Sequence, residues 1–375
     1  MRIRLTETKG NDMADKMNFK KLYDALLDRG YVKDNLIKDT IEWAFGKHSS
    51  GLSEESRIFL TLYFMGLDNG SICIPFEPDA ICEFFPSDLL RVFYAGEECA
   101  EDCVKRIVGK GIADFRKCDC LYSTACSKQK DFDHKKPFVI YKNDSGDGRE
   151  FLFPEKHFRA KSDIQEKIRE LFSTGKLFEP SDEDIGSLNN EIGKLQREDD
   201  NHGFKLNNRQ AEAVLRAEKG ENLFITGGAG TGKTTAVFYL LYKVLKKYKK
   251  DHPEKDWILY LIAPTGKAKD RLGESIGNAF AGIKEDLEEI DKEVFEKIVN
   301  APCFTIHSLL SVDPRKGGFK YDKEKQFEAE SIFVVDEASM IDIGLFASLL
   351  NAIKAKGPRI FILGDENQLP SVEAG

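Results

Sequence analysis

The stretch that most constrains the fold is NLFITGGAGTGKTTAVFYLL, residues 222–241. A short apolar run leads into Gly227–Thr234, which satisfies G-x-x-x-x-G-K-[ST], and an amphipathic segment follows. This is the strand–loop–helix context that the pattern requires. The glycines let backbone N–H groups turn inward around phosphates, and the helix directs its positive N-terminus at them. The stretch therefore predicts a parallel α/β sheet that binds a nucleotide at the end of one strand.

The side chains of this loop suit a magnesium–nucleotide complex. Lys233 can reach the β and γ phosphates, and the Thr234 hydroxyl can bind Mg²⁺. A glycine-rich turn with a stray lysine is the alternative, which the full match and its flanks disfavour. The other predicted nucleotide contacts in the loop are Gly228, Ala229, Gly230, Thr231, Gly232 and Thr235.

A second element of a nucleotide site follows in SIFVVDEASMID, residues 331–342. A carboxylate at the carboxyl end of a parallel strand lies in the crevice where α/β sheets bind ligands. We expect Asp336 to hold Mg²⁺ through its water shell. We expect Glu337 to polarise the attacking water, which makes the reaction hydrolysis rather than transfer. Without a phosphate loop upstream, an Asp-Glu pair after an apolar run is more often a polar strand end.

Three further side chains extend the predicted site. The run RIFILGD, residues 359–365, predicts a core strand whose end places Asp365 and Gln368 near the same crevice. An uncharged amide can hydrogen-bond a γ-phosphate, so Gln368 can report whether that phosphate is present; a plain surface loop is the alternative. Gln210 lies shortly before the phosphate-loop strand and can bond both donor and acceptor edges of adenine, which favours ATP.

Two other strand–helix transitions offer contacts to single-stranded DNA. They are APTGKAKDRL, residues 263–272, and CFTIHSLL, residues 303–310. Hydroxyls, backbone N–H groups and helix N-termini are good partners for successive phosphates of one strand. Each stretch alone could be an ordinary loop, and His307 could be a core histidine. The predicted DNA contacts are Pro264, Thr265, Lys267, Thr305 and His307.

The chain divides into three segments of different character. Residues 1–135 have apolar spacing that predicts a mostly helical domain. Residues 136–204 begin with a predicted β-hairpin over 137–160 and continue as a polar helix and linker. Residues 205–375 alternate short apolar runs with loops and long helices, which is typical of a parallel sheet with crossover helices. We therefore expect a helical N-terminal domain followed by an α/β ATPase domain.

Composition limits the remaining possibilities. The 375 residues are 41% hydrophobic and 32% charged, with a formal net charge of -8. An acidic total confines any DNA contact to a local basic surface and disfavours a passive coat on DNA. The N-terminus has no apolar core of signal-peptide length, and no run is long enough to span a membrane. We expect a cytoplasmic protein whose eight cysteines are thiols or metal ligands.

Five cysteines lie close together in the N-terminal half, at Cys99, Cys103, Cys118, Cys120 and Cys126. A Zn²⁺ or iron–sulfur site is conceivable, because thiolates at short spacings can close a tetrahedron. The stretch contains no paired C-x2-C framework, so buried free thiols are the favoured interpretation.

In order, GGAGTGKTT, APTGKAKDRL, TIHSLL, VVDEASMID and LGDENQLPSVEAG resemble motifs I, Ia, Ib, II and III of superfamily 1 helicases. More narrowly they resemble RecD, the alpha subunit of exodeoxyribonuclease V. In the N-terminal half, Gly70–Ile74 and residues 149–168 are similar to stretches of that subunit.

The resemblance implies a RecA-like P-loop domain in an ATP-driven motor that moves 5′ to 3′ on single-stranded DNA, with ATP and Mg²⁺ as cofactors. It implies RecB-like and RecC-like partners, on which the N-terminal domain docks, in a RecBCD-type complex for double-strand-break repair and recombination. It also implies catalytic roles for Lys233, Glu337 and Gln368.

Helicases of this kind have a second RecA-like domain, which supplies an arginine that stabilises charge on the transferring phosphate. The sequence stops after the resemblance to motif III, so we expect the chain to bind ATP, to hydrolyse it poorly and not to step along DNA unaided. Two alternatives stay open. One is a noncatalytic interaction subunit that binds nucleotide to shape a complex, and the other is a stand-alone RecD-like helicase.

Overall fold

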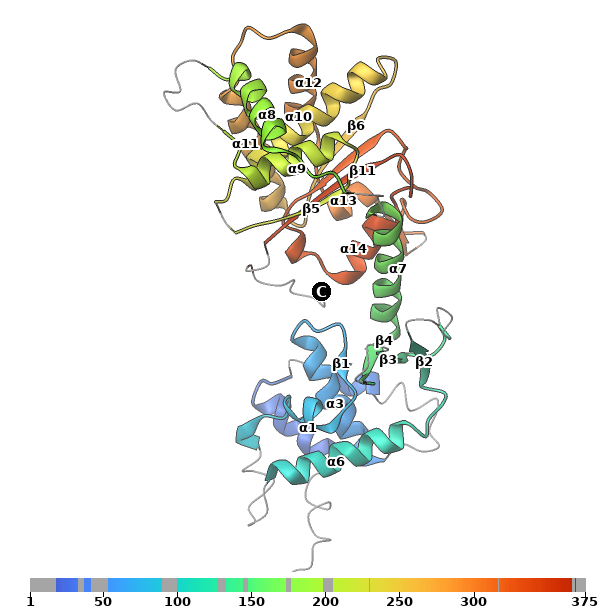
Figure 1. The fold of residues 1–375 in the computed structure, drawn as a ribbon. Coiled ribbons are helices and arrows are strands. Elements are labelled where there is room, and N and C mark those ends of the chain that lie inside the picture. The colour runs from blue at the N-terminus through green and yellow to red at the C-terminus, as the bar shows by residue number, and fades with distance from the viewer. Residues whose placement is uncertain are drawn as a thin grey trace, which may run out of the picture. The chain divides into compact units, whose positions relative to one another are not determined.

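A computed structural model gives the fold of the chain (Figure 1). Its described residues form two compact units, one up to Arg159 and the other from Ala160 onward. The predicted middle segment, 136–204, contributes to both units. The residues that the structure describes are 18–32, 37–41, 53–89, 100–126, 133–143, 148–172, 177–197, 205–228, 230–315, 317–365 and 368.

The C-terminal unit is built on a five-stranded sheet in which every pair of neighbours is parallel. Each strand is one of the short apolar runs of the sequence, so the predicted α/β fold with a RecA-like P-loop domain is confirmed. In spatial order the strands are β5 (Leu223–Thr226), β11 (Arg359–Gly364), β10 (Ser331–Val335), β6 (Ile258–Ala263) and β7 (Cys303–Thr305).

Helices cover both faces of this sheet, because the strand side chains alternate between two apolar cores. In β10, Ile332 and Val334 pack into one core, and Phe333 and Val335 pack into the other. The first core is covered by α8 (Asp182–Leu195), α9 (Asn208–Glu218), α10 (Lys233–Asp251), α11 (Gly266–Ala281) and α12 (Glu289–Val299). The second is covered by α7 (Glu155–Phe172), α13 (Ile306–Leu310) and α14 (Ile343–Asn351).

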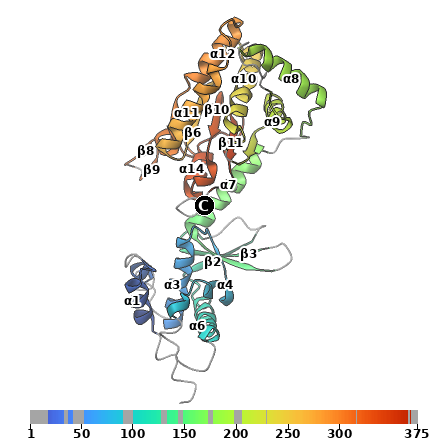
Figure 2. The same ribbon diagram turned by 90° about the vertical axis from the view of Figure 1, so that its left-hand side faces the viewer.

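Two short elements interrupt the alternation of strands and helices. A two-stranded hairpin, β8 (Val312–Asp313) with β9 (Gly318–Phe319), follows α13 (Figure 2). A 3-10 turn, η1 (Ala338–Met340), follows β10. The crossovers place the carboxyl ends of all five strands at one edge of the sheet, which is where α/β folds bind ligands.

The N-terminal unit combines helices with a small sheet of order β1-β4-β3-β2. The predicted hairpin is confirmed as the antiparallel pair β3 (Phe138–Lys142) and β4 (Glu150–Pro154). Two further strands were not predicted: β1 (Ile74–Pro75), which pairs with β4, and β2 (Tyr122–Cys126), which runs parallel to β3. Helices of this unit whose bounds lie within the described residues include α1 (Phe19–Asp28), α3 (Glu54–Asp68), α4 (Pro78–Cys82) and α6 (Ala100–Phe115).

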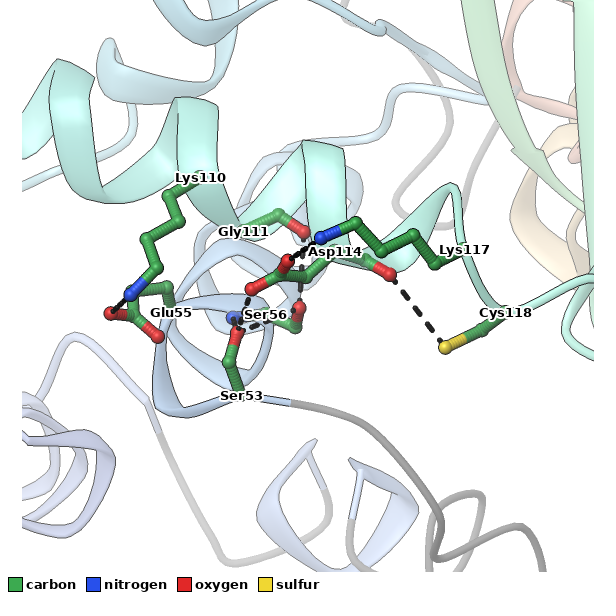
Figure 3. A network of polar contacts seen from close by, with 8 residues as sticks. All are labelled: Ser53, Glu55, Ser56, Lys110, Gly111, Asp114, Lys117 and Cys118. Atoms are coloured by element: carbon green, nitrogen blue, oxygen red, sulfur yellow. Dashed lines mark hydrogen bonds and ion pairs between the residues drawn. The ribbon is translucent and has the colours of Figure 1, made fainter.

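The contact between α3 and α6 is held by close packing and by polar bonds (Figure 3). The Ser56 hydroxyl donates to the Gly111 carbonyl at 3.0 Å, and the Ser53 hydroxyl donates to Asp114 at 2.7 Å. Gly111 permits the approach, because a Cβ on it would lie 2.3 Å from the Glu55 carbonyl oxygen.

The predicted cysteine cluster is only partly described. Cys103 is buried, Cys118 and Cys126 are half-buried and Cys120 is exposed, while Cys99 lies outside the described residues. Within the described ranges, no three His, Cys, Asp or Glu side chains are grouped so that they could hold a metal ion. In the same ranges, none of the helices has the length and apolar character needed to cross a membrane.

Candidate nucleotide site

The glycine-rich loop between β5 and α10 adopts a backbone that requires glycine. Gly230 and Gly232 have φ angles of 74° and 75°, in the left-handed region. A Cβ on Gly232 would also lie 2.8 Å from the Gln210 side-chain nitrogen. Gly232 is the N-cap of α10 and offers no side-chain cap, whereas Asn207, Thr265 and Asp342 cap α9, α11 and α14 with their side chains. The loop thus leaves the N-terminal amides of α10 for a ligand.

Lys233 lies over the loop from the first turn of α10. Its Nζ donates to the carbonyls of Gly228, at 2.9 Å, and Gly227. The Gly227 N–H in turn donates to the Gly364 carbonyl at 3.3 Å, which ties the end of β5 to the end of β11. Because the two bonds to Gly227 and Gly228 hold the amine against the loop, the amine can donate hydrogen bonds to phosphate oxygens that bind there.

Asp336 follows β10 directly and is anchored at the sheet edge. Its N–H donates to the Ile262 carbonyl at 2.8 Å, and its carboxylate accepts from the Glu337 N–H at 2.8 Å. Burial raises the pKa of Asp336, while the Glu337 N–H and the charge of Lys233 act in the opposite direction. The phosphate loop and Asp336 follow β5 and β10, whose carboxyl ends lie at the same edge of the sheet with β11 between them.

Glu337 has a backbone conformation that is rare for a residue with a side chain. Its φ is 49° and its ψ is 41°, in the left-handed region. Such a conformation costs about 1–3 kcal/mol and persists where the surroundings impose it, often at functional sites. Glu337 turns the chain from the end of the buried strand β10 into η1.

Asp365 and Gln368 follow β11, the strand between β5 and β10. Asp365 is buried, and its carbonyl accepts from the Gln368 N–H at 3.2 Å. Gln368 is exposed. The sheet order therefore places the end of β11, which Asp365 follows, between the ends of β5 and β10.

Gln210 lies in the first turn of α9, with both ends of its side-chain amide hydrogen-bonded. Its oxygen accepts from the Asn207 N–H at 3.0 Å, and its nitrogen donates to the Thr231 carbonyl at 2.9 Å. The structure thus connects Gln210 to the phosphate loop, and its contact with adenine stays a prediction. Of the predicted loop contacts, Ala229 lies outside the described residues.

Two grooves flank the loop. The α11 groove, of about 560 Å³, lies between the loop and α11 and is lined by residues 230–235 together with Gln196, Tyr239, Ser275, Asn278, Ala279 and Gly282. The α9 groove, of about 500 Å³, runs between α9 and β5 and includes Arg209, Gln210, Glu212, Arg216 and Lys233. The groove residues outside the loop were not predicted, because they come from α10, α11 and the chain just after α8 and form no local motif.

The residues present fit a magnesium–nucleotide complex. Mg²⁺ prefers hard oxygen ligands and is usually held by one or two protein groups together with substrate phosphates and water. Thr234 supplies a hydroxyl at the start of α10, and Asp336 supplies a carboxylate at the end of β10. This donor set is the one that the sequence predicts for the metal.

The predicted DNA contacts lie on two neighbouring loops, after β6 and β7. Ala263 pairs with Thr305 across these strands. Thr265 caps α11 by accepting from the Ala268 N–H at 3.2 Å, and Thr305 caps α13. Thr265, Lys267 and His307 are exposed and Pro264 is half-buried, and the His307 ring lies edge-on to Phe319 at 5.9 Å. The fold brings these five residues to one part of the sheet edge, and their contact with DNA stays a prediction.

Known proteins and a protein-family model match the part of the chain that forms this site. A family model described as an AAA domain matches residues 210–374. The chain is 41% identical over 167 residues to the RecBCD enzyme subunit RecD of Haemophilus influenzae, a match that covers 44% of the chain and 24% of the relative. It is 29% identical over 238 residues to RecD of Buchnera aphidicola subsp. Schizaphis graminum, covering 64% and 34% respectively.

A third relative is the ATP-dependent RecD2 DNA helicase of Deinococcus radiodurans, 29% identical over 232 residues, with 62% of the chain and 26% of the relative covered. The matches to these three proteins thus span between 24% and 34% of the relatives' own length. The phosphate loop, Asp336, Glu337 and Asp365 all fall inside the AAA domain. The resemblance indicated by the motifs is confirmed: the chain is similar to RecD and RecD2 proteins, and its residues 210–374 match an AAA domain with the fold of a RecA-like P-loop domain.

Proposed function

We propose that this chain is the ATP-binding part of a DNA helicase of the RecD kind, and that it binds and hydrolyses Mg-ATP at the phosphate loop. The observation that carries the proposal is the glycine-rich loop itself, with Gly230 and Gly232 in the left-handed region and the Lys233 amine held against the loop carbonyls. Asp336 follows β10 at the same edge of the sheet, separated from β5 by β11. Relatives with the names RecD and RecD2 helicase support it.

The roles of the residues follow from their positions. Lys233 and the amides of Gly228–Thr235 would hold the phosphates, and Thr234 and Asp336 would hold Mg²⁺, which would neutralise charge on the phosphate oxygens. Glu337 orients the attacking water and takes its proton. Gln368 and Asp365 sense the γ-phosphate from the loop after β11, which lies between the other two groups.

The DNA strand is proposed to bind along the loops after β6 and β7, through Pro264, Thr265, Lys267, Thr305 and His307. Both loops lie at the same sheet edge as the nucleotide site. Because nucleotide and DNA would bind at the same edge of the sheet, hydrolysis of the nucleotide could change the affinity for DNA.

Finer proposals rest on the resemblance of the motifs: 5′ to 3′ movement, action in double-strand-break repair and recombination, and a cytoplasmic location. The proposal of RecB-like and RecC-like partners is supported by relatives named as subunits of a RecBCD enzyme. The RecD2 relative keeps a stand-alone helicase as an alternative. A noncatalytic subunit that binds nucleotide to shape a complex is the other alternative.

Steady-state ATP hydrolysis with and without single-stranded DNA tests the proposal. We expect DNA to stimulate hydrolysis, and Glu337→Gln to lower the rate by about 10²–10⁴-fold while Mg-ATP still binds, because only the general base is removed. Nucleotide binding with a rate that neither DNA nor Glu337→Gln alters would favour the noncatalytic alternative. Repeating the assay with RecB-like and RecC-like subunits, on duplexes with 5′ or 3′ tails, tests partners and polarity.

A further inference from the structure

Strand β5 has an open edge at one side of the parallel sheet. It pairs with β11, and it is the outermost of the five strands on that side. Its residues, Leu223–Thr226, include no proline and no charged side chain. Edge strands are usually protected by such residues, because their free N–H and C=O groups are a template for pairing with another strand. The edge of β5 lacks this protection.

Two residues of β5 present their backbone groups to the open side. The Gly227 N–H donates to the Gly364 carbonyl at 3.3 Å, and alternate residues of a strand bond to the same neighbour. Ile225 therefore bonds towards β11, and the N–H and C=O groups of Phe224 and Thr226 point away from it. In the described part of the chain, these outward groups make no hydrogen bond to another segment.

Phe224 leaves apolar surface at the same edge. Its side chain is 50% exposed, in a strand whose other apolar residues are buried or half-buried. The ring stacks on that of Phe172, at the end of α7, with the ring centroids 4.4 Å apart. Covering the exposed part of the ring would be favourable, because apolar surface would be removed from water.

The α9 groove follows this edge. Its lining includes every residue of β5, together with Gly227 and one side of α9. Consecutive strand residues point to opposite faces of a sheet, so a groove that contacts all of them runs along the edge of the strand and not over one face. The groove, of about 500 Å³, leaves room beside β5 for an extended segment.

The opposite edge of the sheet, at β7, is less open. The three residues of β7 are half-buried, and β7 follows Pro302, which has no N–H to donate. The Pro302 carbonyl already accepts from the Leu261 N–H at 3.3 Å. Addition of a strand is therefore expected at β5 and not at β7.

We infer that β5 pairs with β5 of a second copy of this chain, in an antiparallel contact with a two-fold axis at Ile225. In this register Phe224 exchanges backbone hydrogen bonds with Thr226 of the second copy, and the converse pair does the same. The outward groups of β5 are thereby all paired. The two Phe224 side chains become diagonal neighbours on one face, at a distance that aromatic rings can span.

The edge suits its own copy for two reasons. The spacing of Phe224 and Thr226 is unchanged when the strand is reversed, so donors of one copy meet acceptors of the other. The strand is uncharged, so like charges are not opposed across the axis. A contact of one strand pair is small, so we expect reversible association. The inference is independent of the proposed function, because the contact needs no nucleotide.

Sedimentation velocity of the 375-residue chain at increasing concentration tests the inference. We expect a reversible equilibrium between monomer and dimer. Phe224→Lys places a charge at the edge and should weaken dimerisation by about tenfold or more. Val312→Lys is the matched control, at a residue of β8 that is 61% exposed and lies outside the α9 groove. It should change the dissociation constant by less than about twofold.

A second variant keeps the test decisive if Phe224→Lys does not fold. In the inferred register Ile225 faces its own copy as a pair without hydrogen bonds, in which the Cα atoms lie about 4.5 Å apart. This separation is within the range that a disulfide can bridge. Ile225→Cys should therefore form a covalent dimer with oxidised glutathione, and Val312→Cys should cross-link no more than the unaltered chain.

Three outcomes would overturn the inference. A monomer at every concentration would show that the edge stays unpaired or is covered by another part of the chain. Association that Phe224→Lys and Val312→Lys weaken equally would place the contact on another surface. A dimer that Ile225→Cys does not cross-link would exclude antiparallel pairing of the two β5 strands.

Discussion

Among single residues, Lys233 carries the clearest expectation. Removing its amine in Lys233→Ala takes away charge-assisted hydrogen bonds to phosphate, each worth about 1.5–3 kcal/mol. We expect Mg-ATP affinity to fall by about 10- to 100-fold, as measured by equilibrium titration. Lys250→Ala, at the far and exposed end of the same helix, is the matched control and should bind normally.

We expect the ionised Asp336 carboxylate to lower the stability of the fold while it provides a ligand for Mg²⁺. Because burial raises its pKa, its ionised form is disfavoured in the fold. The carboxyl therefore favours folding most at a pH below its unfolded value, near 3.9, and this contribution is lost as the pH rises through the higher folded value. We expect Asp336→Asn, without nucleotide, to melt at a higher temperature than the unaltered chain at pH 7.

The difference in melting temperature should shrink as the pH is lowered towards 4, and Mg-ATP binding by Asp336→Asn should be weaker. Asp342→Asn is a suitable control, because asparagine caps a helix about as well as aspartate and Asp342 caps α14. An Asp336→Asn variant that melts below the unaltered chain at pH 7 would contradict the proposed cost of the buried charge.

At the scale of helices, two glycines of α6 allow a paired test of the contact between α3 and α6. In Gly111→Ala the new methyl would lie 2.3 Å from the Glu55 carbonyl oxygen and 2.9 Å from the Phe59 Cβ, so the helices must separate. We expect a loss of about 1–3 kcal/mol in the free energy of unfolding, measured with denaturant.

Gly109→Ala is the control for this prediction, two residues earlier in α6. Its methyl would meet the Pro78 ring at 3.6 Å, which is ordinary contact. Alanine in a helix interior is favoured over glycine by about 0.5–1 kcal/mol, so this variant should be neutral or more stable. Equal losses in the two variants would show that the close contact is not the cause.

The strands also show which secondary-structure elements a sequence pattern can predict. The core strands β5, β6, β10 and β11 were predictable, because each is a short apolar run that ends in a glycine or polar loop. The strands β1 and β2 were not, since two residues of β1 gain their role only by pairing with β4, more than 70 residues later. Strand pairing over such distances leaves no local pattern.

For the whole molecule, the two units have separate apolar cores. One core contains residues between Phe19 and Leu152, and the two cores around the parallel sheet contain residues from Leu171 onward. We expect two calorimetric transitions. Mg-AMP-PNP at 100 times its dissociation constant adds about 2.7 kcal/mol to the unit that binds it, which corresponds to a rise of about 5–10 °C.

The N-terminal transition should stay in place when nucleotide is added and should move in Gly111→Ala. A scan in which nucleotide shifts a single transition for the whole chain would show that the units unfold together. The same scan on Lys233→Ala should show no shift with nucleotide.

The phosphate loop, the carboxylates after β10 and the strands that carry them could be predicted from local sequence patterns, because these features depend on neighbours in the chain. The order of the strands, in which β11 separates β5 from β10, came from the fold, and it puts the end of β11 between the phosphate loop and Asp336. The tertiary structure alone gathered Gln196, Tyr239, Ser275 and Asn278 around one groove. Their contacts join helices that are distant in sequence, and packing of that kind is fixed by burial of whole faces rather than by any local motif.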